Sequence, residues 1–182
     1  MQLTQIEFGS LLSYCPRGDS QQIQHSREVR TALKTDGFVS DPLDEDLQIP
    51  MSEWVTQTMS RLRSDLPFTS YFNGNAILVP TPSSSLMQRD SLWVPERIAI
   101  ALVGRGFGLK VVSCLRRTRA VRKAAFSQAE ERPRPSEHYE TMEVQGSLSP
   151  PEEIVLIDDI VTRGATLLGL QIDCMMFFPP RA

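Results

Sequence analysis

Residues 154–166 read IVLIDDIVTRGAT, and this stretch carries the clearest prediction of the fold. Its first four residues, Ile154–Ile157, are all apolar, which is typical of a strand buried on both faces of a parallel sheet. Two carboxylates, Asp158 and Asp159, follow at the carboxyl end of that strand, where open α/β sheets bind their ligands. A turn of small and polar residues then leads into a helix that we expect to begin near Ala165.

The turn has the composition of an anion-binding loop. Backbone N–H groups at a helix N-terminus, together with the positive end of the helix dipole, attract anions. Gly164 allows an anion to approach closely, and the hydroxyls of Thr162 and Thr166 add donors. A ligand that places a phosphate on this turn and donates hydroxyl groups to the two carboxylates has the chemistry of a sugar phosphate. One alternative stays open, because an Asp pair at a strand end can simply cap the helix that follows it.

The segments before this stretch alternate between strand and helix patterns. Ala76–Val79 is a short apolar run that predicts a buried strand. Pro95 suits the first turn of a helix that runs to about Val103, and Leu109–Cys114 predicts a second strand. Strands that alternate with helices indicate an α/β fold, a parallel sheet flanked by helices.

Residues 1–71 fit this alternation less well. We expect a helix near Gln21–Lys34 and an amphipathic helix over Ser52–Leu66, with Ser52 as its N-cap and Pro67 at its end. The predicted organisation is therefore an N-terminal cap or edge region, residues 1–71, followed by the α/β core, residues 72–182.

The composition excludes several other classes of protein. The 182 residues are 41% hydrophobic and 23% charged, which is typical of one globular domain. The net charge of −3 argues against a chain that coats nucleic acid, so we do not expect nucleic acid as a direct ligand. The longest apolar run, Leu167–Phe178, is too short to cross a membrane, and we expect no membrane partner.

The cysteines and histidines predict no metal site. Cys15, Cys114 and Cys174 are far apart in the sequence, and only His25 and His138 could join them, so no zinc-ligand cluster can be assembled from sequence neighbours. Isolated cysteines favour a reduced, cytoplasmic location. We expect His138, a lone histidine in a polar segment, to lie at the surface.

Charge is unevenly distributed along the chain. The stretch Asp36–Glu53 contains six acids and no Lys or Arg, and we interpret it as a solvated loop. The stretch Leu115–Arg134 contains seven bases against two acids. Taken alone, this segment is also interpreted as a solvated loop.

As a whole, residues 154–166 resemble the PRPP-binding motif of type I phosphoribosyltransferases, which bind 5-phosphoribosyl-1-pyrophosphate. That motif has four apolar residues, two acids and then Thr-Thr-Gly-Ala-Thr or a close variant. Arg163 stands here in place of the usual second Thr. We expect the change to be tolerated, because the loop binds phosphate largely through its backbone and Arg can add a phosphate contact.

The resemblance implies a role for each group of residues. Asp158 and Asp159 would hold the ribose hydroxyls and offset the positive charge of an oxocarbenium-like transition state. The 5′-phosphate would lie against Thr162, Arg163, Gly164, Ala165 and Thr166. The pyrophosphate side would include Thr81, Ser83 and Ser84 from the loop after the first strand, with Arg116 and Arg117 from the start of the basic segment. Mg²⁺ would arrive with PRPP, and no protein metal ligands are implied.

Other features are similar to the ComF-like branch of this family, the competence-associated phosphoribosyltransferases. Residues 79–82 read VPTP, and the second strand ends in Leu115-Arg116-Arg117. For the basic segment Leu115–Arg134, the resemblance implies instead a loop that closes over a ligand with several phosphate charges, which a basic composition suits. Two departures are that the chain has no N-terminal four-cysteine zinc element and that Arg89 is the nearest cation to the pyrophosphate loop. The resemblance covers about residues 76–169, half of the chain.

The resemblance implies transfer of the phosphoribosyl group from PRPP to an unidentified nitrogen nucleophile, with release of pyrophosphate. Two alternatives stay open: a non-catalytic PRPP- or nucleotide-binding protein with an accessory or regulatory role in DNA uptake, and an inactive truncated remnant. In this fold at least one strand normally follows the phosphate-loop helix. Because the sequence ends at Ala182, we expect a core without its last strand or strands, and a second copy or another partner over that edge.

Overall fold

The structure is a computed structural model that describes residues 7–14, 18–122, 133–145, 153–161 and 165–170. Three residues of the predicted phosphate turn, Thr162, Arg163 and Gly164, lie outside the described residues. So do residues 123–132 of the basic segment and residues 171–182.

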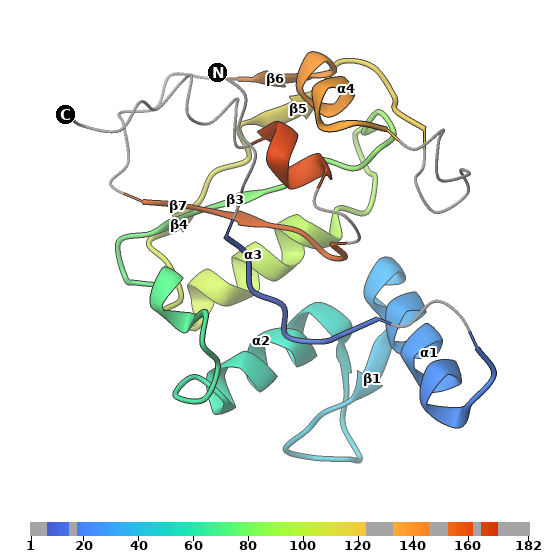
Figure 1. Cartoon of the computed structure of the whole chain (residues 1–182). Helices are drawn as coiled ribbons and strands as arrows, with labels where there is room; N and C mark the ends of the chain where they lie inside the picture. The colour runs from blue at the N-terminus through green and yellow to red at the C-terminus, as the bar shows by residue number, and fades with distance from the viewer. Residues whose placement is uncertain (1–6, 15–17, 123–132, 146–152, 162–164, 171–182) are drawn as a thin grey trace.

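A three-stranded parallel sheet forms the centre of the molecule (Figure 1). Its strands are β3 (Ile77–Pro80), β4 (Lys110–Val111) and β7 (Ile154–Ile157), in the order β4-β3-β7. Both pairings of β3 are parallel, and helices lie on the two faces of the sheet. The predicted α/β class with a parallel sheet between helices is thus confirmed at this level.

The side chains of β3 alternate between two apolar clusters, one on each face of the sheet. Leu78 points into the cluster that contains Phe107 and the apolar side of α3 (Val94–Gly104). Ile77 and Val79 point into the other cluster, which holds Cys114, Leu115, Met142 and Leu170. Burial of each large side chain contributes about 1.5–3 kcal/mol, and β3 is buried along its whole length, as its apolar sequence predicts.

Helix α3 connects β3 to β4, and Pro95 lies in its first turn as predicted. The strand predicted over Leu109–Cys114 is instead short. The N–H of Val112 still donates to the carbonyl of Leu78, but the chain then leaves the parallel sheet. It continues as β5 (Leu115–Arg117), which pairs antiparallel with β6 (Met142–Val144). Helix α4 (Pro135–Glu140) precedes β6.

The N-terminal region comprises α1 (Gln21–Thr35), a hairpin of β1 (Phe38–Ser40) and β2 (Gln48–Pro50), and α2 (Met51–Arg61). A short 3₁₀ turn (Thr69–Tyr71) precedes the core. Helix α2 packs on α3, and its apolar side chains belong to the same cluster as Leu78. The N-terminal region therefore shares its apolar core with one face of the sheet.

Two details of α2 differ from the prediction. Ser52 is not the N-cap, because the helix begins one residue earlier and Pro50 has no side-chain acceptor. The carboxylate of Asp36 supplies the cap instead, accepting the backbone N–H of Ser52 at 2.8 Å from 16 residues away. The helix also ends at Arg61 rather than Leu66, since residues 61–65 are exposed and one more turn would bury little apolar surface.

The interpretation of Asp36–Glu53 as a solvated loop is wrong for its structure. The segment forms the β1–β2 hairpin and the start of α2, and two of its acids, Asp36 and Asp41, are buried. Hydrogen bonds explain the burial of Asp41, which accepts the N–H of Leu43 at 2.7 Å and the amide of Gln57 at 3.1 Å. These bonds replace the water that each carboxylate loses.

No helix in the described part of the chain is both long and apolar enough to span a bilayer.

Candidate functional site

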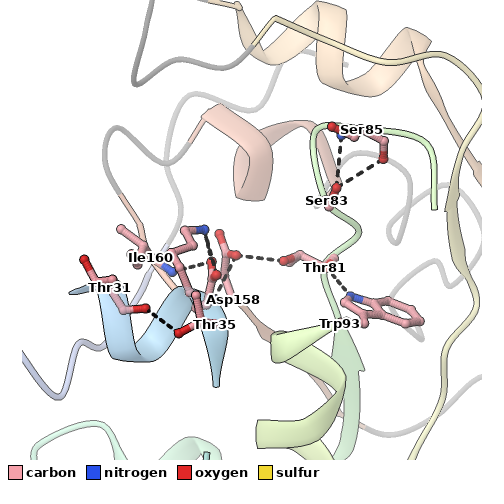
Figure 2. A network of polar contacts seen from close by, with 10 residues as sticks. Thr31, Thr35, Thr81, Ser83, Ser85, Trp93, Asp158 and Ile160 are labelled. Atoms are coloured by element: carbon pink, nitrogen blue, oxygen red, sulfur yellow. Dashed lines mark hydrogen bonds and ion pairs between the residues drawn. The ribbon is translucent and has the colours of Figure 1, made fainter. Parts of the chain in front are cut away.

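The candidate site lies where β3 and β7 end side by side. Pro80 pairs with Ile157 in the parallel register, so the next residues, Thr81 and Asp158, are neighbours. The hydroxyl of Thr81 donates to Oδ1 of Asp158 at 2.9 Å (Figure 2). The position lies between two strands whose following helices cover opposite faces of the sheet, α3 one face and the helix over residues 165–170 the other. Open α/β sheets bind ligands at such points.

The loop after β3 is held in place at this edge. The indole N–H of Trp93, the residue before α3, donates to the carbonyl oxygen of Thr81 at 2.8 Å (Figure 2). Thr81 is itself buried, at 1% exposure. The backbone of Thr81 is therefore held both by the end of β3 and by the indole, which keeps its hydroxyl beside Asp158.

Asp158 is a carboxyl group with an unusual protonation equilibrium. Its Oδ1 accepts the Thr81 hydroxyl and the backbone N–H of Asp159, and its Oδ2 has no hydrogen-bond partner among the described residues. Burial, followed by the negative charge of Asp159, raises the pKa of Asp158 to about 7. A carboxyl group in this state can accept or donate a hydrogen bond near neutral pH.

Asp159 is paired with a residue of the N-terminal region. The ammonium of Lys34 contacts both of its carboxylate oxygens, Oδ1 at 2.8 Å and Oδ2 at 2.6 Å. Oδ1 also accepts the backbone N–H of Ile160 at 2.8 Å. Figure 2 shows the last turn of α1, marked by Thr31 and Thr35, beside Asp158 and Ile160. Helix α1 therefore contributes a cation to the end of β7.

A second polar network joins the loop after β3 to the helix over residues 165–170. Arg117 on β5 donates through Nε to the carbonyl of Ser83 at 2.7 Å and through Nη1 to the hydroxyl of Thr141 at 2.8 Å. Its Nη2 lies 3.3 Å from Nδ1 of His138. The hydroxyl of Thr166 approaches the same Nδ1 at 3.5 Å.

His138 is buried at 6% exposure, so the prediction that it lies at the surface is wrong. The reason is that α4 packs against the helix over residues 165–170, where Gly169 leaves room for it; a Cβ there would approach the Cβ of His138 to 2.9 Å. Burial first, and then the charge of Arg117, lower the pKa of His138 to about 4. The imidazole is therefore neutral at pH 7, and its Nδ1 is available as an acceptor.

Arg117 is a buried cation at 3% exposure. Burial lowers its pKa to about 10, so it stays charged at neutral pH. No carboxylate pairs with it in the described part of the chain. Its charge therefore makes the electrostatic potential around Ser83 and Thr166 more positive.

The remaining predicted residues have the following positions. Ser83 and Ser85 share two hydrogen bonds within the loop, which Figure 2 shows, and the carbonyl of Ser84 accepts the N–H of Val121. Arg116 is exposed on β5, on the side opposite Arg117. Ala165 begins the helix over residues 165–170, while Thr162, Arg163 and Gly164 lie outside the described residues.

The structure therefore brings together residues that the sequence analysis singled out in separate segments. Thr81 contacts Asp158, while Ser83 and Thr166 belong to one network through Arg117 and His138. Sequence reasoning missed Lys34, which looked like any basic residue in the last turn of a helix. It also missed Trp93, for which the sequence offered no signal beyond its place just before a helix.

The described residues contain no group of three or more His, Cys, Asp or Glu side chains arranged to hold a metal ion. Comparison with known proteins gave no further guide: no family model, no curated protein and no solved structure matches the chain.

Chemically, the arrangement offers two hydrogen-bonding carboxyl groups beside a hydroxyl, with a cation, Lys34, on Asp159 and a second cation, Arg117, on the loop after β3. Asp158 and Asp159 can accept hydrogen bonds from neighbouring hydroxyls of a ligand. Lys34 and the buried Arg117 favour a ligand with negative charge.

Proposed function

We propose that the chain is a phosphoribosyltransferase-like protein that binds PRPP and transfers its phosphoribosyl group to a nitrogen nucleophile with release of pyrophosphate. The observation that carries the proposal is the contact between Thr81 and Asp158. It brings the loop proposed for the pyrophosphate to the carboxylates proposed for the ribose, at the edge of the sheet where α/β proteins bind ligands.

In this proposal the residues of the chain bind, orient and stabilise charge. Asp159 and Asp158 accept the ribose hydroxyls, and their negative charge offsets the positive charge that develops at C1 as the bond to pyrophosphate breaks. Thr81, Ser83 and Ser84 lie on the pyrophosphate side with Arg116, while Arg117 holds the loop through the carbonyl of Ser83. Thr162, Arg163, Gly164, Ala165 and Thr166 hold the 5′-phosphate.

When PRPP is bound with Mg²⁺, the ion would neutralise charge on the pyrophosphate as it leaves, and the proposal assigns it no protein ligand. The acceptor, a base or an amine, binds opposite the leaving group. We assign it no residue of this chain.

PRPP binding is the first property to test. Calorimetry with PRPP and Mg²⁺ should give measurable heat with the wild-type chain and none with the double variant Asp158→Ala, Asp159→Ala. Asp46→Asn, an exposed acid in the β1–β2 hairpin, is the matched control and should bind as the wild type does. Equal binding by the double variant and the wild type would overturn the proposal.

A second measurement separates catalysis from binding alone. A transferase releases pyrophosphate from PRPP when the correct acceptor is present, and a panel of purines, pyrimidines, glutamine and ammonia covers the main nitrogen nucleophiles. A protein that binds PRPP but releases no pyrophosphate with any of them would fit the non-catalytic alternative, an accessory or regulatory binder.

A further inference from the structure

The ion pair between Lys34 and Asp159 joins two residues 125 positions apart in the sequence. The side chain of Asp159 is only 10% exposed, whereas that of Lys34 is 47% exposed. The ammonium therefore approaches the carboxylate from the solvent side and covers it. This pair differs from an ordinary surface ion pair, in which both partners are largely in water.

The backbone around Lys34 is anchored to the core. Two residues later, Asp36 ends α1 in the left-handed conformation, and its carboxylate is almost fully buried, at 1% exposure. Its Oδ2 accepts Nη1 of Arg97, on α3, at 2.7 Å, and its Oδ1 caps α2 at Ser52. The end of α1 is thus tied to α3, which packs against the sheet, and to α2, which packs on α3, and these bonds set the reach of Lys34.

The pair occupies the acceptor positions that a ligand would need. Oδ1 of Asp159 already accepts Ile160 and Lys34, and Oδ2 accepts Lys34. A carboxylate accepts about four hydrogen bonds, so these three leave room for one more donor. Two neighbouring hydroxyls of a ligand can therefore both bond to Asp159 only if the ammonium moves. Moving it is costly for a ligand that offers hydroxyls alone, because the ammonium then loses its partner. A ligand with anionic groups beside its hydroxyls gives the ammonium a new partner.

We infer that Lys34 is a positioning and specificity-determining residue: it covers Asp159 in the free protein and transfers to the pyrophosphate group when a ligand that carries both a vicinal diol and a pyrophosphate binds. This inference rests on the proposed function. It adds that a residue of the N-terminal region, Lys34, selects for ligands that carry a pyrophosphate group at C1 of the ribose. The exchange of partners makes binding of the fully charged ligand favourable and binding of its fragments unfavourable.

The test compares two probes that differ by the pyrophosphate group. Dissociation constants for PRPP and for ribose 5-phosphate, each with Mg²⁺, are measured by calorimetry on the full chain. Lys34→Met should weaken PRPP binding by about tenfold, the loss of one charged contact, and should strengthen ribose 5-phosphate binding severalfold. The ratio of the two affinities therefore falls, by more than about tenfold. Lys34→Arg retains the charge and should restore most of the wild-type ratio.

Lys110→Met is the matched control, because it removes the same charge from an exposed lysine at the other edge of the sheet. It should leave the ratio unchanged. If Lys34→Met does not give the cooperative melt of the wild type, Lys34→Gln, which keeps a polar end group, replaces it in the same comparison.

The outcomes are distinct. A lower ratio in the Lys34 variant alone supports the inference. Equal weakening of both probes means that Lys34 only stabilises the fold and overturns it, while the proposed function stands. No binding of PRPP by the wild-type chain overturns the proposed function and the inference with it.

Discussion

The guanidinium of Arg117 donates to the carbonyl oxygen of Ser83 at 2.7 Å, across the gap between β5 and the loop that follows β3. The bond is made by a buried cation for which the described residues offer no carboxylate, and it fixes the loop that we place on the pyrophosphate side. Arg117 also reaches Thr141 and His138, so one side chain connects β5, α4 and that loop.

This geometry predicts a large stability effect for Arg117→Met. The substitution removes the donor to the Ser83 carbonyl, which is exposed, and to two buried groups, the hydroxyl of Thr141 and Nδ1 of His138, the latter keeping only the longer contact with Thr166. A buried acceptor that loses its partner costs about 1–3 kcal/mol. We expect the free energy of unfolding to fall by about 2 kcal/mol, measured by urea denaturation. Arg116→Met is the control, because Arg116 is the exposed neighbour on the same strand, and it should change stability by less than about 0.5 kcal/mol. A similar loss in both variants would contradict the assignment.

We expect the protein to lose stability in acid because the pKa of His138 is lowered on folding. Its pKa is about 6.5 in the unfolded chain and about 4 in the folded protein, so the unfolded state binds the extra proton first. The contribution of neutral His138 is complete above the unfolded value and decreases as the pH falls toward the folded one. Relative to His138→Gln, which keeps an acceptor but does not titrate, the wild type should lose on the order of 2 kcal/mol over this interval.

The measurement is thermal or urea unfolding of both proteins across that pH range. His25→Gln serves as the control, since His25 lies on the exposed surface of α1, and its substitution should leave the acid dependence of the wild type intact. Parallel stability curves for wild type and His138→Gln would show that His138 is not buried in its neutral form.

The pH dependence of stability that Asp158 contributes has the opposite sign. Its pKa rises from 3.8 in the unfolded chain to about 7 in the folded protein, so the folded state holds the proton more tightly. Stability is greatest below the unfolded value and is lost as the pH rises through the folded one. Asp158→Asn removes this penalty and can still accept the Thr81 hydroxyl through its Oδ1. We expect it to be more stable than the wild type above about pH 7, by on the order of 2 kcal/mol, while binding PRPP poorly.

Unfolding in urea at a pH above 7 and again near pH 4 tests this difference, which should shrink toward zero at the lower pH. Asp46→Asn should show no such difference, because Asp46 is exposed. A variant that is less stable than the wild type at high pH would contradict a raised pKa for Asp158.

Asp36 should stabilise the N-terminal region. Burial by itself would raise its pKa, but the hydrogen bonds from Arg97 and Ser52 outweigh that effect and lower it. Stability is therefore present above the ordinary Asp value and is lost as the pH falls through the lowered one. Asp36→Asn keeps the shape but loses the ion pair, and we expect it to cost about 1–3 kcal/mol at neutral pH. Asp65→Asn, at an exposed position, should cost less than about 0.5 kcal/mol. Equal stability of Asp36→Asn and the wild type would remove Asp36 as the anchor of α1.

Local sequence patterns predicted the elements of the sheet well. A run of four apolar residues indicated β7 at Ile154–Ile157, and the chain forms a strand with these bounds. The run at residues 76–79 indicated β3, and Pro95 indicated the start of α3. These predictions depend on side-chain periodicity and on the fixed φ of proline, both of which are properties of neighbouring residues.

The same patterns failed where a distant partner decides the outcome. Ser52 looks like an N-cap, but the cap of α2 is Asp36, because that carboxylate is held in place by Arg97, far away in the sequence. His138 looked exposed, since no local pattern shows that α4 packs over Gly169. The hydrogen bonds of the candidate site are of this long-range kind.

The sequence by itself determined the α/β class, the position of β7 and the presence of two adjacent carboxylates at its end, because strand periodicity is encoded within a few residues. Only the tertiary structure decided that β3 is the central strand, which places Thr81 beside Asp158, 77 residues away. It alone placed Lys34 on Asp159. Strand order and helix docking follow from burial of apolar surface across the whole chain, and that burial has no local signature in the sequence.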